Sequence, residues 1–139
     1  MSVQLNPYLS FRDSARAALT FYQSVFGGEV TLSTYAENGM ADEDPTEADK
    51  IMHGQLIGED GLTLMAADTP NSMDLTMGST VSMSLSGDDT ERLTRYWTAL
   101  STDGTVTMPL EEAPWGDSFG MCTDSFGVDW MVNISGATA

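Results

Sequence analysis

The sequence predicts an α+β domain built from two copies of one βαβββ unit, the first over residues 1–77 and the second over residues 78–139. Three observations predict this fold class: two amphipathic helices, strand-like segments in the same order around each helix, and a match between the two halves when one is shifted onto the other. The 139 residues suit one domain with a proper core. Because one such unit cannot cover both faces of its own sheet, we expect the two copies to pack together.

Apolar residues at helical spacing predict the two helices. The first follows Asp13 and Ser14, either of which can act as N-cap, and ends at the glycine pair 27–28. The second follows the aspartate pair 88–89, whose carboxylates suit the positive end of the helix dipole, and it ends at the turn 102–104.

The segments around the helices repeat as well. Strand patterns cover 5–11, 29–36, 51–57 and 62–67 in the first half, and 80–86, 105–108, 119–123 and 128–134 in the second. A shift of 75 residues brings Asp13 onto Asp88, and one further residue in the next turn brings Val30 onto Val106. Chance rarely produces such a repeat, so it predicts two modules of like topology. Residues 38–49 are expected to form a loop, and residues 68–79 the linker between the modules.

Acidic residues dominate the charge of the chain. Asp and Glu number 21 against five Lys and Arg, which gives a net charge of −16 and a pI near 4.1. Such a surface repels phosphate backbones and argues against nucleic-acid binding. Solubility is the simplest explanation, because the sequence shows no focused acidic group that would attract a cationic ligand. With no apolar run near the ~20 residues of a membrane span, no secretory signal and only one cysteine, we expect a cytoplasmic protein with no membrane contact.

Several motifs resemble one protein family, in the same order and over nearly the whole chain. They are NPYLSF followed by AALTFYQSVFGGEV, then IMHGQL, LTLMAADTP and GTVTMPLEEAPWGDSFGMCTDSFGVDWMVN. Together they resemble the PhnB-like branch of the vicinal oxygen chelate superfamily, which includes glyoxalase I, extradiol dioxygenases and bleomycin-sequestering proteins. The resemblance implies that the modules form a curved mixed sheet, a half-barrel around a cleft, with the helices on the outer face. It also implies a homodimer and, in the enzymes, a divalent metal held by His and Glu in the cleft.

The residues at the metal-ligand positions that the resemblance implies do not suit a metal. Counted from the helices and turns, these positions fall at Pro7, Met65 (or Ala67), Ser82 and Met131. None of them restores a set of His and Glu ligands. The sequence therefore predicts no cofactor, and a divalent metal belongs only to the alternative hypothesis of a metal-dependent lyase, transferase or dioxygenase.

His53, the only histidine, is the candidate catalytic residue. Imidazole titrates near neutral pH and can act as a general base, although a structural histidine is the commoner outcome. Strand alternation would place Ile51, His53 and Gln55 on one face. Further residues are candidates for lining a ligand pocket: Tyr8, Tyr35, Met65, Ser82, Trp115, Met121 and Met131. Trp115, in a loop bounded by Pro and Gly, would close over the ligand above His53.

These observations favour a small-molecule-binding protein whose ligand the sequence does not identify. The binding could serve sequestration, sensing or a metal-free enzyme, so the sequence leaves open whether the protein is catalytic. Cys122 is expected to be buried and unreactive, because a reactive thiol needs an electropositive neighbour.

Overall fold

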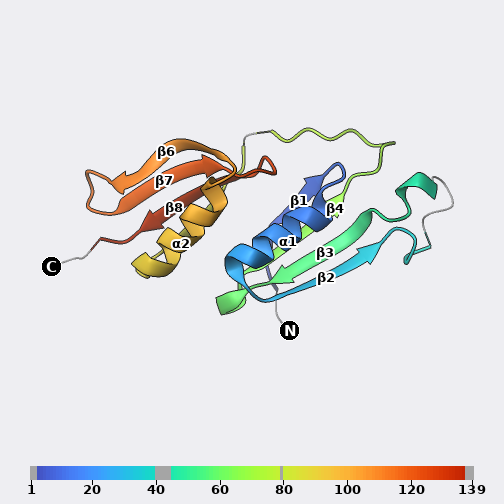
Figure 1. Cartoon of the computed structure of the whole chain (residues 1–139), viewed down its shortest axis with the longest axis horizontal. Coiled ribbons are helices and arrows are strands. Elements are labelled where there is room, and N and C mark those ends of the chain that lie inside the picture. The colour runs from blue at the N-terminus through green and yellow to red at the C-terminus, as the bar shows by residue number, and fades with distance from the viewer. Residues whose placement is uncertain (1–2, 40–44, 79, 137–139) are drawn as a thin grey trace. The chain divides into compact units, whose positions relative to one another are not determined.

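A computed structural model describes residues 3–39, 45–78 and 80–136. The chain forms two compact units, Met1–Thr76 and Met77–Ala139, here called module 1 and module 2. Each module consists of a four-stranded mixed sheet and one α-helix (Figure 1). The predicted α+β class and the repeated βαβββ order are therefore confirmed.

In its described residues, module 1 contains one α-helix and four strands, with two short 3-10 helices in its loops. Its elements are β1 (Tyr8–Phe11), α1 (Ala15–Phe26), β2 (Glu29–Thr34), η1 (Pro45–Glu47), β3 (Ile51–Ile57), η2 (Glu59–Gly61) and β4 (Thr63–Asp68). The strand order is β1-β4-β3-β2, with β1 parallel to β4 and the other pairs antiparallel.

Module 2 repeats this topology. Its elements are β5 (Met83–Gly87), α2 (Thr90–Ser101), β6 (Thr105–Glu112), β7 (Ser118–Thr123) and β8 (Asp129–Ile134). The order β5-β8-β7-β6, with β5 parallel to β8, is that of module 1.

The predicted strands differ from the observed ones mainly in the first strand of each module and in β6. The strands predicted over 5–11 and 80–86 are shorter, because pairing with β4 and β8 begins only at Tyr8 and Met83. The strand predicted over 105–108 runs on to Glu112, through two irregularities in its pairing with β7. Pro109 is tolerated there because β6 is an edge strand that does not need every N–H for the ladder.

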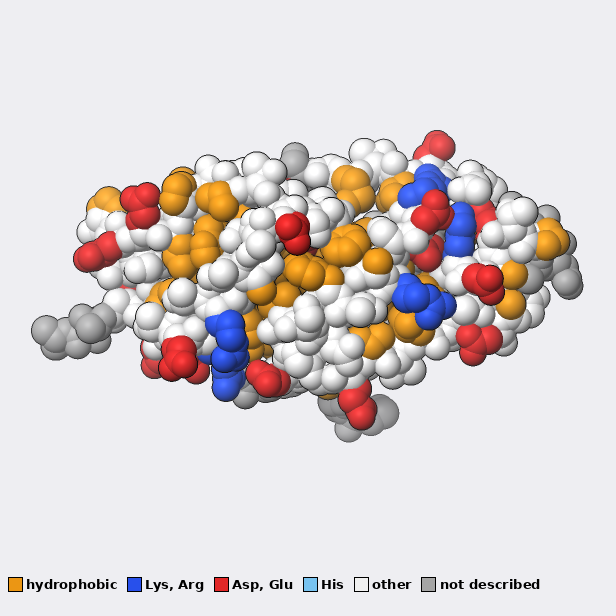
Figure 2. Space-filling view, in the orientation of Figure 1, with side chains coloured by type: hydrophobic (Ala, Val, Ile, Leu, Met, Phe, Trp, Pro, Cys, Tyr) orange, Lys and Arg blue, Asp and Glu red, His pale blue; other side chains and the backbone are white. Residues whose placement is uncertain are grey.

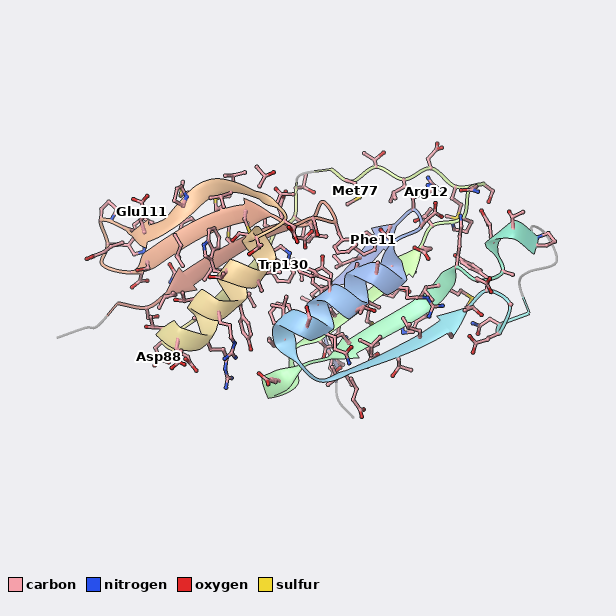
Figure 3. All side chains as sticks on the ribbon, in the orientation of Figure 1. Phe11, Arg12, Met77, Asp88, Glu111 and Trp130 are labelled. Atoms are coloured by element: carbon pink, nitrogen blue, oxygen red, sulfur yellow. The ribbon has the colours of Figure 1, made fainter. Side chains whose placement is uncertain are left out.

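Each module buries one face of its sheet against its own helix. Apolar side chains of the helix and of alternate strand positions make the cores: Phe11, Leu19, Tyr22, Phe26, Leu56 and Leu64 in module 1, and Leu93, Tyr96, Leu100, Cys122, Trp130 and Val132 in module 2. Trp130, labelled in Figure 3, is 2% exposed.

A glycine before the second strand allows close backbone packing in both modules. A Cβ on Gly28 would overlap the carbonyl oxygen of Ile57, and a Cβ on Gly104 would overlap that of Thr123. Gly28 also has a φ of +88°, which side chains of L-residues rarely adopt. The two glycines occupy equivalent places, before β2 and before β6, so the repeat extends to a steric detail of the scaffold.

The N-terminus of α1 is capped differently from the prediction. Ser14 is the N-cap residue, but its side chain makes no capping hydrogen bond. Instead the buried carboxylate of Asp68 accepts hydrogen bonds from the backbone N–H of Ala15 (2.9 Å) and of Ile51 (2.9 Å). Asp68, predicted to begin the linker, is thus the last residue of β4 and ties the helix to the sheet. In α2 the prediction is confirmed, because Asp89 accepts from the N–H of Arg92 (3.0 Å).

Module 2 has its own buried carboxylate, at a different place. Asp124, 4% exposed, follows β7 and accepts hydrogen bonds from the backbone N–H of Phe126 and of Val128. Its second oxygen accepts from the indole N–H of Trp130 at 2.8 Å. The residue therefore shapes the β7–β8 turn rather than a helix end.

The loop predicted over 38–49 contains η1, and its residues 40–44 lie outside the described part of the chain. Acidic side chains are scattered over the face of the molecule shown in Figure 2, with few basic ones between them. In the described ranges, every helix is too short or too polar to cross a membrane.

Candidate functional site

Each sheet has a face that its own helix does not cover, here called the open face. Gly54 of β3 points toward α1, because a Cβ there would meet the side chain of Leu19. In module 2, Gly120 of β7 points toward α2 in the same way and would meet Trp97. Since side chains alternate along a strand, the neighbours of these glycines in β3 and β7 point to the open faces.

The open face of module 1 brings Tyr8 and His53 together. Tyr8 is the register partner of Met65, and Met65 is the partner of Gln55, so the three lie side by side. Tyr8 Oη lies 3.1 Å from Nδ1 of His53, and the ring centroids are 5.7 Å apart.

Tyr35 lies beside this pair. Its hydroxyl donates a hydrogen bond to the backbone carbonyl of Asp68 (2.8 Å). Burial, followed by the Asp68 carboxylate, raises the pKa of Tyr35, and the nearby Tyr8 acts in the same direction. Tyr8 and His53 thus form a pair that can donate and accept hydrogen bonds, and Tyr35 lies near Tyr8 with its own hydroxyl bound to the backbone.

The predicted alternation in β3 holds for His53 and Gln55 but not for Ile51. The pairing with β2 shifts between Ser33 and Thr34, which inserts one extra residue in β3 before His53. Ile51 is 1% exposed and belongs to the core, whereas His53 and Gln55 are partly exposed. A β-bulge of this kind cannot be recognised from apolar spacing alone.

The open face of module 2 is apolar at its centre. Met108, Met121 and Met131 are successive register partners across β6, β7 and β8. Ser84 of β5 completes this row, since it is the partner of Met131. Ser82, the predicted candidate, precedes β5 and is exposed. The methionines give a flexible, polarisable surface to which ligands of different shape can fit.

Polar pairs lie on both sides of this row, two residues away along β7 and β8. On one side, the hydroxyl of Thr123 donates to the carboxylate of Asp129 at 2.6 Å. On the other side, the amide of Asn133 donates to Asp117 at 3.0 Å, and the N–H of Gly136 donates to the same carboxylate at 2.8 Å. The Gly136 hydrogen bond, with that of Asn133, lowers the pKa of Asp117. These pairs frame the apolar row with fixed hydrogen-bonding groups.

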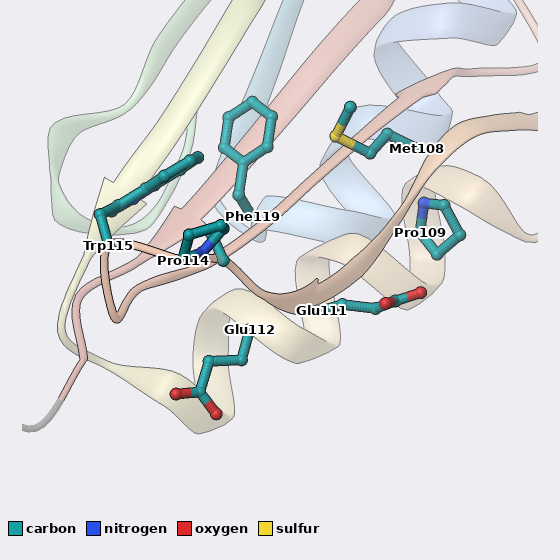
Figure 4. Close-up of a pocket in the computed structure, with 8 residues that line it drawn as sticks. Met108, Pro109, Glu111, Glu112, Pro114, Trp115 and Phe119 are labelled. Atoms are coloured by element: carbon teal, nitrogen blue, oxygen red, sulfur yellow. The ribbon is translucent and has the colours of Figure 1, made fainter.

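Trp115 lies in the loop between β6 and β7, as predicted, and is 64% exposed. Its ring meets that of Phe119 edge to face, with centroids 6.1 Å apart. The two rings belong to a hollow of about 370 Å³ that Met108 and Pro109 also line (Figure 4). The sequence prediction missed Phe119. Its position two residues before Met121 in the same strand was the available signal, because residues two apart in a strand point to the same face.

The side chains on the central strands of the open faces are poorly suited to a hard divalent metal. Met65 lies on β4 and Met131 on β8, and a thioether is a poor ligand for such an ion. Asp129 is the nearest carboxylate on β8, and its side chain is already hydrogen-bonded to Thr123. Among the described residues, no three His, Cys, Asp or Glu side chains gather closely enough to hold an ion.

Cys122 is buried on the helix side of β7, with 2% of its surface exposed. Burial, assisted by the negative charges of Asp124 and Asp129, raises the pKa of its thiol to about 11. The thiol is therefore a poor nucleophile at neutral pH, in agreement with the prediction.

Comparisons with known proteins support the sequence resemblance. A sequence model of the Glyoxalase/Bleomycin resistance protein/Dioxygenase superfamily matches residues 4–132. Protein YjdN of Escherichia coli is 28% identical over 140 residues, which cover 94% of each chain. Protein PA1353 from Pseudomonas aeruginosa is 36% identical with a TM-score of 0.81 over 97% of this chain and 99% of its own. A Bacillus cereus PhnB protein, described as a putative 3-demethylubiquinone-9 3-methyltransferase, is 25% identical with a TM-score of 0.77 over 96% of this chain and all of its own.

Proposed function

The chain belongs to the Glyoxalase/Bleomycin resistance protein/Dioxygenase superfamily, and from that premise we propose that it is a small-molecule-binding protein of the PhnB-like branch that works without the superfamily metal. The proposal also includes a cytoplasmic location and a homodimer, for which the sequence provides the grounds.

The observation that carries the proposal is the chemistry of the central strands. β4 and β8 present Met65 and Met131 to the open faces, and each is flanked in register by partly exposed side chains. Thioethers are poor ligands for the hard divalent ions that activate oxygen substrates, but they pack well against organic molecules. Each open face is therefore better suited to contact with a carbon skeleton than to a metal-bound substrate.

The Tyr8–His53 pair supplies directional contacts in this proposal. Imidazole and phenol can each donate or accept a hydrogen bond, so the pair can hold a carbonyl or hydroxyl oxygen of the ligand. The second ring nitrogen of His53, Nε2, can make a further hydrogen bond to the ligand. This gives His53 a role in positioning the ligand and, where chemistry follows, in proton transfer.

Mass spectrometry of the intact purified protein under native conditions tests the proposal. We expect a retained or added organic ligand without a stoichiometric metal, and ligand binding that a strong chelator leaves unchanged. Loss of ligand binding with EDTA, restored by one equivalent of a divalent ion, would establish the metal-dependent alternative. Light scattering at micromolar protein should give the mass of a dimer, and a monomer mass would contradict that part.

A further inference from the structure

The hollow beside the β6–β7 hairpin has the size and walls of a site for a small organic molecule. Its volume of about 370 Å³ lies within the range of ligand pockets. Apolar side chains line most of it, from Met108 and Pro109 at one end to Pro114 and Trp115 at the other. All of these residues belong to a single module.

Two aromatic rings form a corner in this hollow. Trp115 and Phe119 meet at an interplanar angle of 61°, so the ring planes stand at a steep angle to each other. Figure 4 shows the two rings on the same side of the hairpin. Because 64% of Trp115 is exposed, its ring is accessible to a ligand. The electron-rich face of an indole attracts cations within about 6 Å of the ring.

The charge around the corner is negative. Glu111 and Glu112 are exposed and also line the hollow. The hairpin sequence from 105 to 123 contains no Lys or Arg to neutralise them. The fold thus places two glutamates in the wall of the hollow that also contains the aromatic rings, a grouping that the sequence did not predict. In Figure 4 both carboxylates extend away from the rings.

We propose that this hollow binds a small organic cation with an aromatic or apolar body. The body packs in the corner between Trp115 and Phe119, and the cationic group lies at the rim, near Glu111 and Glu112. This inference rests on the proposed small-molecule-binding function and specifies the ligand class for module 2. The two glutamates and the net charge of −16 favour a cation over a neutral or anionic molecule of the same shape, while the rings bind the body that such molecules share.

Three probes with the same ring and different head groups test the charge preference. Benzylammonium, benzyl alcohol and benzoate are titrated into the isotopically labelled full chain at pH 7, with the Trp115 indole and Gly116 amide as NMR reporters. We expect benzylammonium to bind about fivefold more tightly than benzyl alcohol, and benzoate to bind more weakly than either. Added salt should reduce the advantage of the cation.

Two double variants separate the local carboxylates from the overall charge. Glu111→Gln with Glu112→Gln should bring the affinity for benzylammonium close to that for benzyl alcohol. Glu29→Gln with Glu59→Gln, a matched control in module 1, lowers the negative charge equally and should keep the preference. Trp115→Ala should weaken both probes, because it removes one wall of the hollow.

Each other outcome overturns the inference in a recognisable way. If benzylammonium and benzyl alcohol bind equally, the hollow is a small-molecule site without charge selection, and the proposed function stands. If the control variant loses the preference as fully as the Glu111/Glu112 variant, overall charge and not this site attracts the cation. If no probe shifts the Trp115 and Gly116 signals, the hollow is not a ligand site, and the proposed function then depends on the native mass spectrometry alone.

Discussion

The open face of module 1 carries Tyr8, His53 and Tyr35, whereas that of module 2 carries a row of three methionines. Strand order, strand directions and the glycine before the second strand are the same in both modules. The buried carboxylates differ, since Asp68 caps a helix while Asp124 organises a turn. The comparison indicates that the two modules share one backbone arrangement. They differ in the side chains on their open faces and in the hydrogen-bonding roles of their buried aspartates.

The strongest test of the shared scaffold is the glycine that precedes β2 and β6. Gly28→Ala and Gly104→Ala should each lower the free energy of unfolding by roughly 2–4 kcal/mol, because the new Cβ would overlap a strand carbonyl. Urea denaturation measures the effect. Gly61→Ala is the control, since its φ is also positive but no atom lies within 4 Å, and it should cost only about 1 kcal/mol. A Gly104→Ala variant as stable as wild type would show that the two modules pack differently at this point.

The buried aspartates test how far the modules are stabilised separately. Asp68→Asn and Asp124→Asn should each cost about 2 kcal/mol, because the amide group cannot accept from every N–H that the carboxylate satisfies. Hydrogen exchange should show faster opening of module 1 in the first variant and of module 2 in the second. Equal loss of protection in both modules would mean that they unfold as one cooperative unit.

These two carboxylates also show the limits of sequence-based prediction. Alternation and helical spacing are local, and they predicted both α-helices and the eight strands of the described residues, but they missed the second half of β6 and the two 3-10 helices. Asp68 acts on Ala15, 53 positions away, and such a long-range hydrogen bond leaves no mark on local spacing. For the same reason the sequence suggested His53 and Tyr8 separately, but only the register of β1, β4 and β3 brings them within hydrogen-bond distance.

The two modules should respond to opposite extremes of pH. In module 1, the hydrogen bond from Lys50 to Asp13 (2.7 Å) raises the pKa of Lys50. The stability it contributes is present below the ordinary lysine pKa and is lost as the pH rises through the raised value. In module 2, the lowered pKa of Asp117 means that its contribution is present above the ordinary aspartate pKa and is lost as the pH falls through the lowered value.

Two single variants check this difference between the modules. Lys50→Met should reduce the melting temperature at pH 7 and 9 but make less difference in strong alkali. Asp117→Asn should reduce it at pH 7 and make less difference as the pH falls below about 4, the ordinary range of an aspartate. Asp74→Asn, an exposed change in the linker, serves as the control for both series. A constant difference across pH for either variant would contradict the assigned group.

The smallest effect is expected for Tyr8→Phe. Because Tyr8 is 51% exposed, loss of its hydrogen bond to His53 should change stability by less than about 1 kcal/mol. The ring ¹⁵N shifts of His53 should nevertheless change, since the hydroxyl helps to select the imidazole tautomer. His53→Gln should weaken ligand binding, because the variant lacks the imidazole that is proposed to contact the ligand. Unchanged binding would leave His53 with a structural role alone.

Because Cys122 is buried, the rate at which its thiol is modified can measure how often module 2 opens. Its sulfur lies between sheet and helix and is protonated at neutral pH, so a thiol reagent can modify it only when the surrounding structure opens. Because it is the only cysteine in the chain, the rate of labelling reports on that half without any engineered probe. A ligand that binds to the folded state of module 2 would lower the labelling rate of Cys122. The size of that decrease would measure the affinity of the ligand without an assay for any reaction.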